Sequence, residues 1–425
     1  MEIRNIRWPD DQEAILDYIR LEYGLDDYDS LSTSYGTHPT FDPADCFVID
    51  GDDGEIAAHG MIVSRQLQIG ESVLPTAEIS MLGVLEPYRG YGFEHELLEA
   101  LHLRMTERED VLGLSFGEPL LFEPWLYEYA VGIYLTSYES EITTDLALKA
   151  GYWDVEHSYE RRTADRLGAR NRSLAVRRFY INDLPAIQAL YSAECARGHY
   201  LMARDDPTWY WQLDHLTRIG RNDPDDFLVA EADGQLAAYV RLVTQGQVNM
   251  FRDEAARFNV IEAGGTHADA IEALLGEIAR MAQTFNVERI GLFVHPDSAF
   301  MEHALARGAV LRQFTGAGFV HLHNLPMALY LLTPTLESRR LNSRFASRSY
   351  HLVINTEHDQ ADIYLGMGSE PEVVELEAPA TSVVRLFTGW YCIDNLTMGY
   401  HERHADLLRV LFPKRDPKIG MADLI

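Results

Sequence analysis

The stretch LEPYRGYGFEHELLEA, residues 85–100, joins an apolar run that ends at Val84 to a segment with a helical pattern. Four apolar residues of that segment recur at i, i+4 spacing: Phe93, Leu97, Leu101 and Met105. The pattern predicts a strand, a glycine turn and then a helix that begins at Phe93. Such a helix leaves its first backbone amides without acceptors, and its dipole adds about half a positive charge there.

The turn before this helix suits an anion. Gly90 and Gly92 allow close approach of the backbone, and Arg89 contributes a fixed positive charge. The turn has neither the spacing of a P-loop nor a complete G-x-G-x-x-G pattern. Glu94 and Glu96 complement the helix dipole, but a carboxylate at about 6 Å would repel a phosphate by a few kcal/mol at most. The alternative is an ordinary helix start without a ligand.

Composition restricts the partners. The chain has 425 residues, which favours two or three domains, and 36 Lys plus Arg against 66 Asp plus Glu give a net charge of −30. This charge disfavours nucleic acid and agrees either with solubility alone or with a cationic substrate. The three cysteines, Cys46, Cys195 and Cys392, form neither a disulfide framework nor a zinc motif. With neither a signal peptide nor a membrane span expected, we predict a cytoplasmic protein.

An internal repeat divides the chain. FVIDGDDGEIAAHGMIV at 47–63 matches FLVAEADGQLAAYVRLV at 227–243 with an offset of 180 residues, and each copy predicts a β-hairpin with an Asp-Gly turn. A helical pattern precedes each hairpin, and a strand, a glycine turn, a helix and another strand follow it. In the second copy the turn is Gly264-Gly265 and Asp269 aligns with Arg89, so the cation is missing. The second copy is therefore expected to be structural.

The last hundred residues follow another pattern. NLPMALYLLTP, SYHLVIN, QADIYLG and PEVVELEAP are predicted as short strands, and TSVVRLFTGW and HERHADLLRVLFP as amphipathic helices. We therefore predict an α+β protein with three domains, at residues 1–165, 166–324 and 325–425.

The stretch VLEPYRGYGFEHELLEAL resembles the acyl-coenzyme A pyrophosphate loop of the GNAT acetyltransferase superfamily, R/Q-x-x-G-x-G/A. Two such units with a third domain, and the closing LFPKRDPKIGMADLI, resemble the enhanced intracellular survival (Eis-like) branch. That resemblance implies two GNAT domains in tandem, the second degenerate, a sterol carrier protein-like α/β domain, acetyl-CoA as co-substrate and a homo-oligomer. The implied coenzyme contacts are Leu82, Val84, Arg89, Gly90, Tyr91, Gly92, Phe93, Glu94 and Ser115. Glu94 replaces a small residue, so we expect weakened coenzyme binding.

The resemblance also implies catalytic groups. In that branch a tyrosine within I-Y-G-R-F-G-Y-G is the general acid that protonates the departing thiolate. This chain has Phe122 at that position, and a phenyl ring donates no proton. Tyr127 is our preferred substitute, with Tyr129 as another, although Tyr127 could equally be a packing residue. The base would be the terminal carboxylate of Ile425, whose alternative fate is a frayed terminus.

These residues predict an N-acetyltransferase that acts on a primary amine of a cationic small molecule, such as an aminoglycoside or polyamine, or on a lysine. The alternatives are a degenerate acyl-CoA or small-molecule binding protein and a lipid-binding C-terminal domain. No metal cofactor is expected: His401 and His404 are too close for H-E-x-x-H, and His321 and His323, on one strand face, have no evident third ligand.

Overall fold

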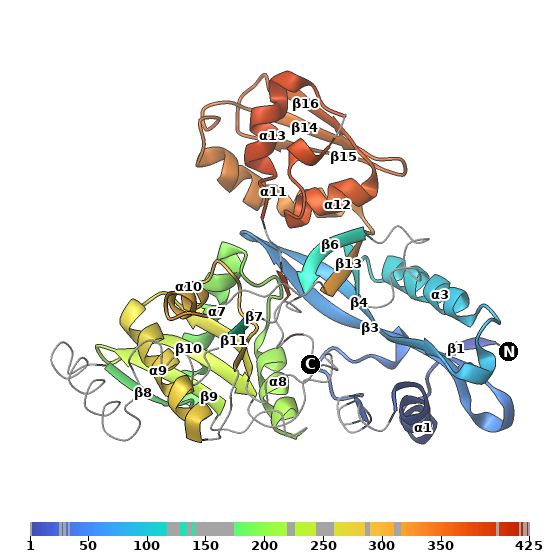
Figure 1. Cartoon of the computed structure of the whole chain (residues 1–425). Helices are drawn as coiled ribbons and strands as arrows, with labels where there is room; N and C mark the ends of the chain where they lie inside the picture. The colour runs from blue at the N-terminus through green and yellow to red at the C-terminus, as the bar shows by residue number, and fades with distance from the viewer. Residues whose placement is uncertain are drawn as a thin grey trace. The chain divides into compact units, whose positions relative to one another are not determined.

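The computed structural model of the chain describes most of the sequence (Figure 1). The described residues are 2–24, 28, 31–32, 35–116, 128–133, 138–140, 174–218, 226–243, 259–284, 290–309, 316–396, 399–415, 418–419 and 423. They fall into two units. Unit 1 comprises Met1–Gly132, Leu201–Trp211 and Ala317–Pro417, and unit 2 comprises Ile133–Tyr200, Gln212–Gly316 and Lys418–Ile425. No helix in the described part of the chain is long and apolar enough to cross a bilayer.

Unit 1 is built on a mixed sheet. Its strands, in spatial order, are β1 (Ile3–Asn5), β2 (Cys46–Asp50), β3 (Ile56–Ile69), β4 (Ser72–Val84), β5 (Leu112–Ser115), β13 (Gly316–Leu322) and β6 (Glu128–Ile133). The first four strands are antiparallel, β5 is parallel to β4, and β13 is antiparallel to β5. The sheet thus becomes parallel where β4 meets β5.

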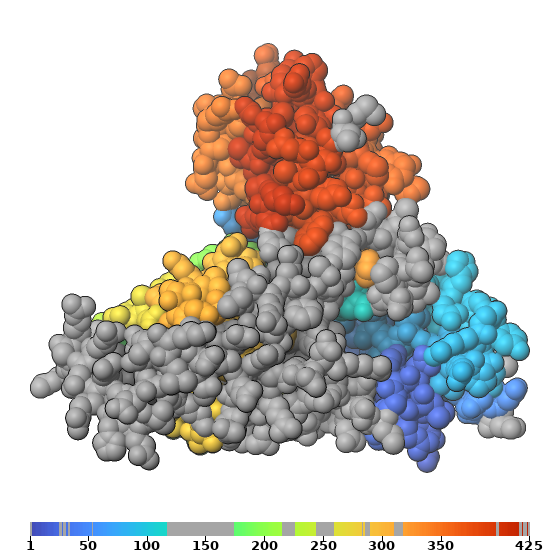
Figure 2. All heavy atoms as spheres, viewed as in Figure 1, coloured from blue at the N-terminus to red at the C-terminus, as the bar shows by residue number. Residues whose placement is uncertain are grey.

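Two helices flank the long strands β3 and β4 of this sheet (Figure 1). Helix α1 (Gln12–Tyr23) buries Ile15, Tyr18 and Ile19. Helix α3 (Phe93–Glu107) buries the predicted stripe of Phe93, Leu97, Leu101 and Met105, so the predicted helix start is confirmed. Its outer face, in cyan, lies on the surface in Figure 2. The i, i+4 pattern therefore gave both the bounds of α3 and the face that it buries.

Unit 2 repeats the order of elements found in unit 1. Its sheet has the order β7 (Tyr138–Ser140), β12 (Ile290–Leu292), β11 (Asn259–Gly265), β10 (Gln235–Val243), β9 (Phe227–Ala232) and β8 (Leu174–Arg178). Its helices are α7 (Leu184–Arg197), α9 (Ala268–Thr284) and α10 (Ala299–Ala306), and α8 (Asp206–Arg218) extends from unit 1 into unit 2. Helix α7 follows β8 as α1 follows β1, and α9 joins β11 to β12 as α3 joins β4 to β5. The elements thus follow the 180-residue repeat.

Turns differ between the copies. In the second hairpin Asp233 and Gly234 both have positive φ (53° and 77°), as an Asp-Gly hairpin turn requires. In the first, a short 3-10 turn at Asp52–Gly54 gives only Gly54 a positive φ, 85°.

The prediction of a turn at Gly264-Gly265 was wrong, because both residues end β11. A Cβ on Gly264 would lie 2.5 Å from the ring of Tyr239, so glycine is needed there for close packing.

Strands cross the predicted domain boundaries. Strand β7 lies within residues 1–165 of the sequence but pairs with β12, and β13 lies within residues 166–324 but pairs with β5. Cutting the chain at residues 165 and 324 would therefore remove one strand from each sheet.

The C-terminal segment contains one correction. NLPMALYLLTP was predicted as a strand but begins helix α11 (Leu325–Leu341). The side chain of Asn324 accepts a hydrogen bond from the amide of Met327 (3.0 Å) and caps the helix, and Pro326 is tolerated in the first turn. The buried apolar residues follow helical spacing: Leu325, Ala328, Leu329, Leu332 and Leu336. The apolar run is too short to distinguish helical from strand spacing by itself, so the prediction chose a strand.

The other predicted elements of this segment are confirmed. A sheet of three strands has the order β15 (Gln360–Leu365), β14 (Tyr350–Asn355) and β16 (Glu372–Glu377), followed by α12 (Ala380–Thr388) and α13 (Ala405–Leu411). Helix α11 also contacts the turn between β3 and β4. The hydroxyl of Thr335 accepts hydrogen bonds from the amides of Glu71 (2.9 Å) and Ser72 (3.0 Å) and lies 2.6 Å from the carbonyl oxygen of Ile69. One buried hydroxyl thus bonds three backbone groups of this turn.

Thr335→Val should destabilise the protein by about 1–3 kcal/mol, because two amides of the β3–β4 turn lose their acceptor while the side-chain volume is kept. Thr333→Val is the matched control, since in the described part of the chain its hydroxyl bonds the carbonyl of Leu329 within the same helix (3.2 Å) and not the β3–β4 turn. Thermal unfolding should separate the two variants. Equal midpoints would show that the Thr335 hydroxyl does not hold the turn.

Candidate functional site

Strand β4 separates from its neighbour at its carboxyl end. Pairing with β5 covers Thr76–Ile79, and β5 ends at Ser115 opposite Ile79, whereas β4 continues to Val84. On its other edge β4 pairs with β3, with an irregularity between His59 and Met61. Met81 lies in this bulge with a φ of 51°, a conformation that costs energy for a residue with a Cβ. Among the described residues, the pairing of β4 with β5 thus ends before Leu82 and Val84 are reached.

The turn that follows β4 presents free donors. Gly90 and Gly92 both have a φ of 87°, and a Cβ on either would meet open space. Among the described residues no carbonyl accepts from the amides of Gly90, Gly92, Phe93 or Glu94. These amides, with the positive end of the α3 dipole, form a donor set of the kind that binds a phosphate.

The turn is fixed to the first hairpin by Tyr88. Its hydroxyl donates to the carboxylate of Glu55 (2.5 Å) and accepts from the amide of Asp52 (2.9 Å). The ring of Tyr88 is buried, with its centre 6.4 Å from that of Phe93. The start of α3 is therefore held before any ligand arrives.

Arg89 is held by the backbone and by an acid. Its Nε donates to the carbonyl of Val84 (3.1 Å), and its Nη2 lies 3.1 and 3.2 Å from the two carboxylate oxygens of Glu22 in α1. The guanidinium side chain is 57% exposed, while that of Glu22 is 14% exposed. Burial raises the pKa of Glu22, Arg89 opposes this, and the charge of Glu94 adds to the increase. Glu22 thus forms an ion pair with the arginine that would also contact a bound phosphate.

A buried histidine supports the bulge. Nδ1 of His59 lies 3.0 Å from the carbonyl oxygen of Met81, and Nε2 lies 2.9 Å from the hydroxyl of Tyr35. A carbonyl only accepts, so Nδ1 carries the proton and Nε2 accepts from Tyr35. Burial lowers the pKa of His59 to about 4, so the ring is neutral at pH 7. His59 therefore orients the peptide group of Met81 without adding charge.

The structure brings the predicted coenzyme residues to one end of the sheet. Leu82 and Val84 lie in β4, Phe93 and Glu94 begin α3, and Ser115 ends β5. The residues between them form the turn: Arg89, Gly90, Tyr91 and Gly92. Tyr91 is 70% exposed, and its ring stacks on that of Phe93 with centres 5.8 Å apart. The turn therefore has an exposed aromatic face next to its free amides.

The predicted catalytic groups cannot be placed in this way. Tyr127 and Ile425 lie outside the described residues, as does Phe122, and Tyr129 is described only as part of the backbone of β6. Asp423 is described, in unit 2. Its buried carboxylate accepts from the hydroxyl of Tyr191 (3.2 Å) and from the amide of Gln212 (3.0 Å). The chain is thus anchored two residues before its last one.

Sequence reasoning missed Glu22, Tyr35 and His59. Glu22 lies in the last turn of α1 and His59 lies within the repeated hairpin, where only apolar residues had been considered. The available signal for His59 was its isolated polar side chain in the apolar run from Ile56 to Val63, which requires buried partners.

In unit 2 a carboxylate of the protein bonds the backbone at the end of β11. There the amide of Gly265, at the end of β11, donates to the carboxylate of Glu194 in α7 (3.2 Å). Burial opposes ionisation of Glu194, but His199, Gly265 and Arg197 outweigh it and lower its pKa. Asp269 lies in the first turn of α9. A protein carboxylate therefore bonds at the end of β11, which supports the structural role predicted for the second copy.

Comparison with known proteins agrees with this geometry. Residues 2–129 match the sequence family described as acetyltransferase (GNAT) domain. No curated protein sequence matches the chain. Among solved structures, a GCN5-related N-acetyltransferase from Anabaena variabilis has 14% identity and a TM-score of 0.62, with 98% of each chain covered. Eis1 from Mycobacterium abscessus has 14% identity and a TM-score of 0.57, with 99% of each chain covered.

A third solved structure, from Enterococcus faecalis, is described as a probable N-acyltransferase. It has 12% identity and a TM-score of 0.60, with 99% of this chain and 97% of that chain covered. At these identities the likeness concerns the fold, while the match over residues 2–129 identifies the domain. The N-terminal part of the chain is therefore a GNAT acetyltransferase domain, and the protein is an acyltransferase enzyme.

Proposed function

We propose that the protein transfers an acetyl group from acetyl-CoA to a primary amine of a cationic acceptor, such as an aminoglycoside, a polyamine or a lysine side chain. The observation that carries the proposal is the set of free amides at the start of α3, beside Arg89 and the open end of β4. The amides and Arg89 would bind the diphosphate, and the edge of β4 at Leu82 and Val84 would bind the pantetheine arm.

Acyl transfer also needs a donor for the oxyanion of the tetrahedral intermediate. We assign this role to a backbone amide at Leu82, because the bulge at Met81 turns the strand there and His59 holds the Met81 carbonyl. The neutral amine attacks the thioester carbonyl, the carbon–sulfur bond breaks and the coenzyme thiolate takes a proton. For that proton and for the base we retain Tyr127 and the carboxylate of Ile425 as proposals.

We also propose the domain organisation of the Eis-like branch: GNAT domains at residues 1–165 and 166–324, and a sterol carrier protein-like domain at 325–425, in a homo-oligomer. The shared order of elements in the two units supports the tandem arrangement. The likeness in fold to Eis1 over 99% of this chain supports the whole organisation. The net charge of −30 favours a cationic acceptor, because it attracts cations at low salt.

The function is tested by thiol release from acetyl-CoA with a panel of amines. We expect turnover with polyamines or aminoglycosides and little with an acidic amine, and added salt should raise KM for the cationic acceptor as charge is screened.

Arg89→Gln should reduce kcat/KM at least about 10-fold, because a charge-assisted contact to phosphate is lost. Binding of acetyl-CoA without release of thiol for any amine would contradict the proposal.

Glu22→Gln and Glu94→Gln should each bind acetyl-CoA more tightly, by about 3- to 10-fold. The first frees Arg89, and both remove negative charge near the diphosphate, where repulsion costs up to a few kcal/mol. Glu99→Gln is the control, on the same helix and 62% exposed. Calorimetric titration measures the three affinities, and no gain for Glu22→Gln or Glu94→Gln would show that the acids do not oppose the coenzyme.

His59→Leu should lower kcat by about 10- to 100-fold with a smaller change in KM, because Met81 loses the bond that orients it. His59→Gln should recover part of the rate, since an amide can donate to Met81 and accept from Tyr35. Steady-state kinetics compare the two variants with Tyr35→Phe, which removes the bond to Nε2 of His59 and leaves the bond from Nδ1 to Met81 in place. Identical kcat values for His59→Leu and wild type would exclude a positioning role.

A further inference from the structure

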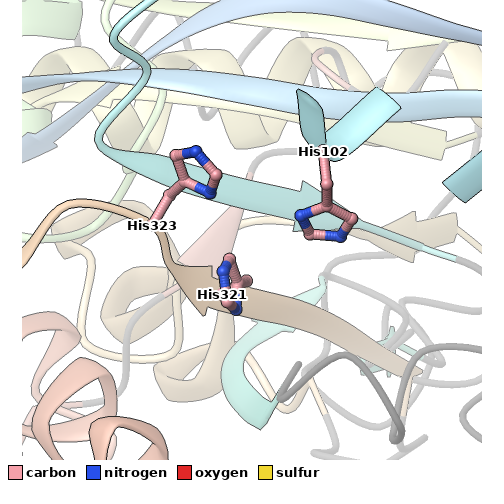
Figure 3. Close-up of side chains that lie close together, drawn as sticks. All are labelled: His102, His321 and His323. Carbon is pink, nitrogen blue, oxygen red and sulfur yellow. The ribbon is translucent and has the colours of Figure 1, made fainter. Parts of the chain in front are cut away.

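Three histidines meet between α3 and β13 (Figure 3). His102 comes from α3, His321 from β13, and His323 directly follows that strand. One nitrogen of each ring lies within 4.8 Å of one nitrogen of each of the others, and among the described residues this is the one such group of three. The third partner that the sequence did not reveal is therefore His102, which is distant in the chain and brought close by the fold.

Backbone pairing explains the meeting. His321 lies opposite Gly113 in the antiparallel pair of β13 and β5, and the amide of His323 donates to the carbonyl of Val111 (3.0 Å). Residues two apart on a strand share a face, so both rings lie on one side, where Gly113 adds no side chain. His102 follows the buried Leu101 on α3.

Each of the three residues offers one ring nitrogen as a ligand atom. Neutral imidazole is the form that binds metal ions. All three side chains are partly exposed, so an ion can reach them from solution. The cluster therefore has the chemistry of a nitrogen-ligand site.

The geometry is close to that of a bound ion. Ligands about 2.1 Å from a tetrahedral ion lie about 3.4 Å apart, so nitrogens within 4.8 Å of one another need to close by at most about 1.4 Å. Nε2 of His323 lies 3.0 Å from the hydroxyl of Thr106, which itself donates to the carbonyl of His102 (3.0 Å). Such outer contacts orient metal-binding histidines.

We propose that His102, His321 and His323 bind one borderline transition-metal ion, with Zn²⁺ as the reference ion and one coordination position left to water. The ion fastens α3 to β13. Because α3 begins at the anion-binding turn, the site stabilises the helix that carries that turn and takes no part in the transfer itself. This inference does not depend on the identity of the acceptor.

The test uses full-length protein freed of metal with a chelator and titrated with Zn²⁺ by calorimetry. We expect one ion per chain and a rise in the thermal midpoint, because ligand binding stabilises the folded state. Co²⁺ should give the strong visible absorption of a four-coordinate ion with nitrogen ligands. Each of His102→Gln, His321→Gln and His323→Gln should weaken binding by at least about 10- to 100-fold.

His95→Gln is the matched control, because it removes a histidine of the same helix that lies outside the cluster. It should bind as wild type does. Thermal unfolding in chelator shows whether each variant folds, since all should then resemble metal-free wild type. Absence of stoichiometric binding, retained affinity in the triple variant, or an equal loss in His95→Gln would each overturn the proposal.

Discussion

Among the residues that the structure describes, no carbonyl accepts from the first backbone amides of α3, and the site is organised around this constraint. Gly90 and Gly92 accept the positive φ that turns the amides outward, Tyr88 fixes the turn to the first hairpin, and the Val84 carbonyl holds Arg89 at its edge. Water satisfies such exposed donors until an anion replaces it. Glu22 binds the arginine but not these amides, so the empty protein keeps the donors for a ligand.

The two units share an order of helices and strands but differ in what the acidic residue of the helix before the hairpin binds. In unit 1 the helix before the first hairpin places Glu22 on an exposed arginine, where water and phosphate can compete for it. In unit 2 the equivalent helix α7 places Glu194 in a buried position, where it bonds the amide at the end of β11 directly. A buried carboxylate with several donors is not displaced by a mobile anion. Unit 2 thus uses this carboxylate to bond its own backbone.

Local patterns in the sequence predicted much of the fold. The i, i+4 stripe from Phe93 gave the bounds of α3, and the Asp-Gly pair gave the second hairpin, because these features depend on neighbouring residues. The prediction failed at NLPMALYLLTP, where a short apolar run fits either period and the Asn324 cap decides for a helix. In the site, the turn could be predicted, but Glu22, His59 and His102 could not, since their partners come from other elements.

The placement of β13 has a consequence for biosynthesis. Strand β5 leaves the ribosome early, but the strand that pairs with it, β13, is made only after β8 to β12 of unit 2. During that interval the nascent chain carries an unpaired strand edge, which other chains can join. Co-translational folding of the catalytic domain must therefore wait for the following domain, and truncated transcripts should yield aggregation-prone products rather than a smaller enzyme.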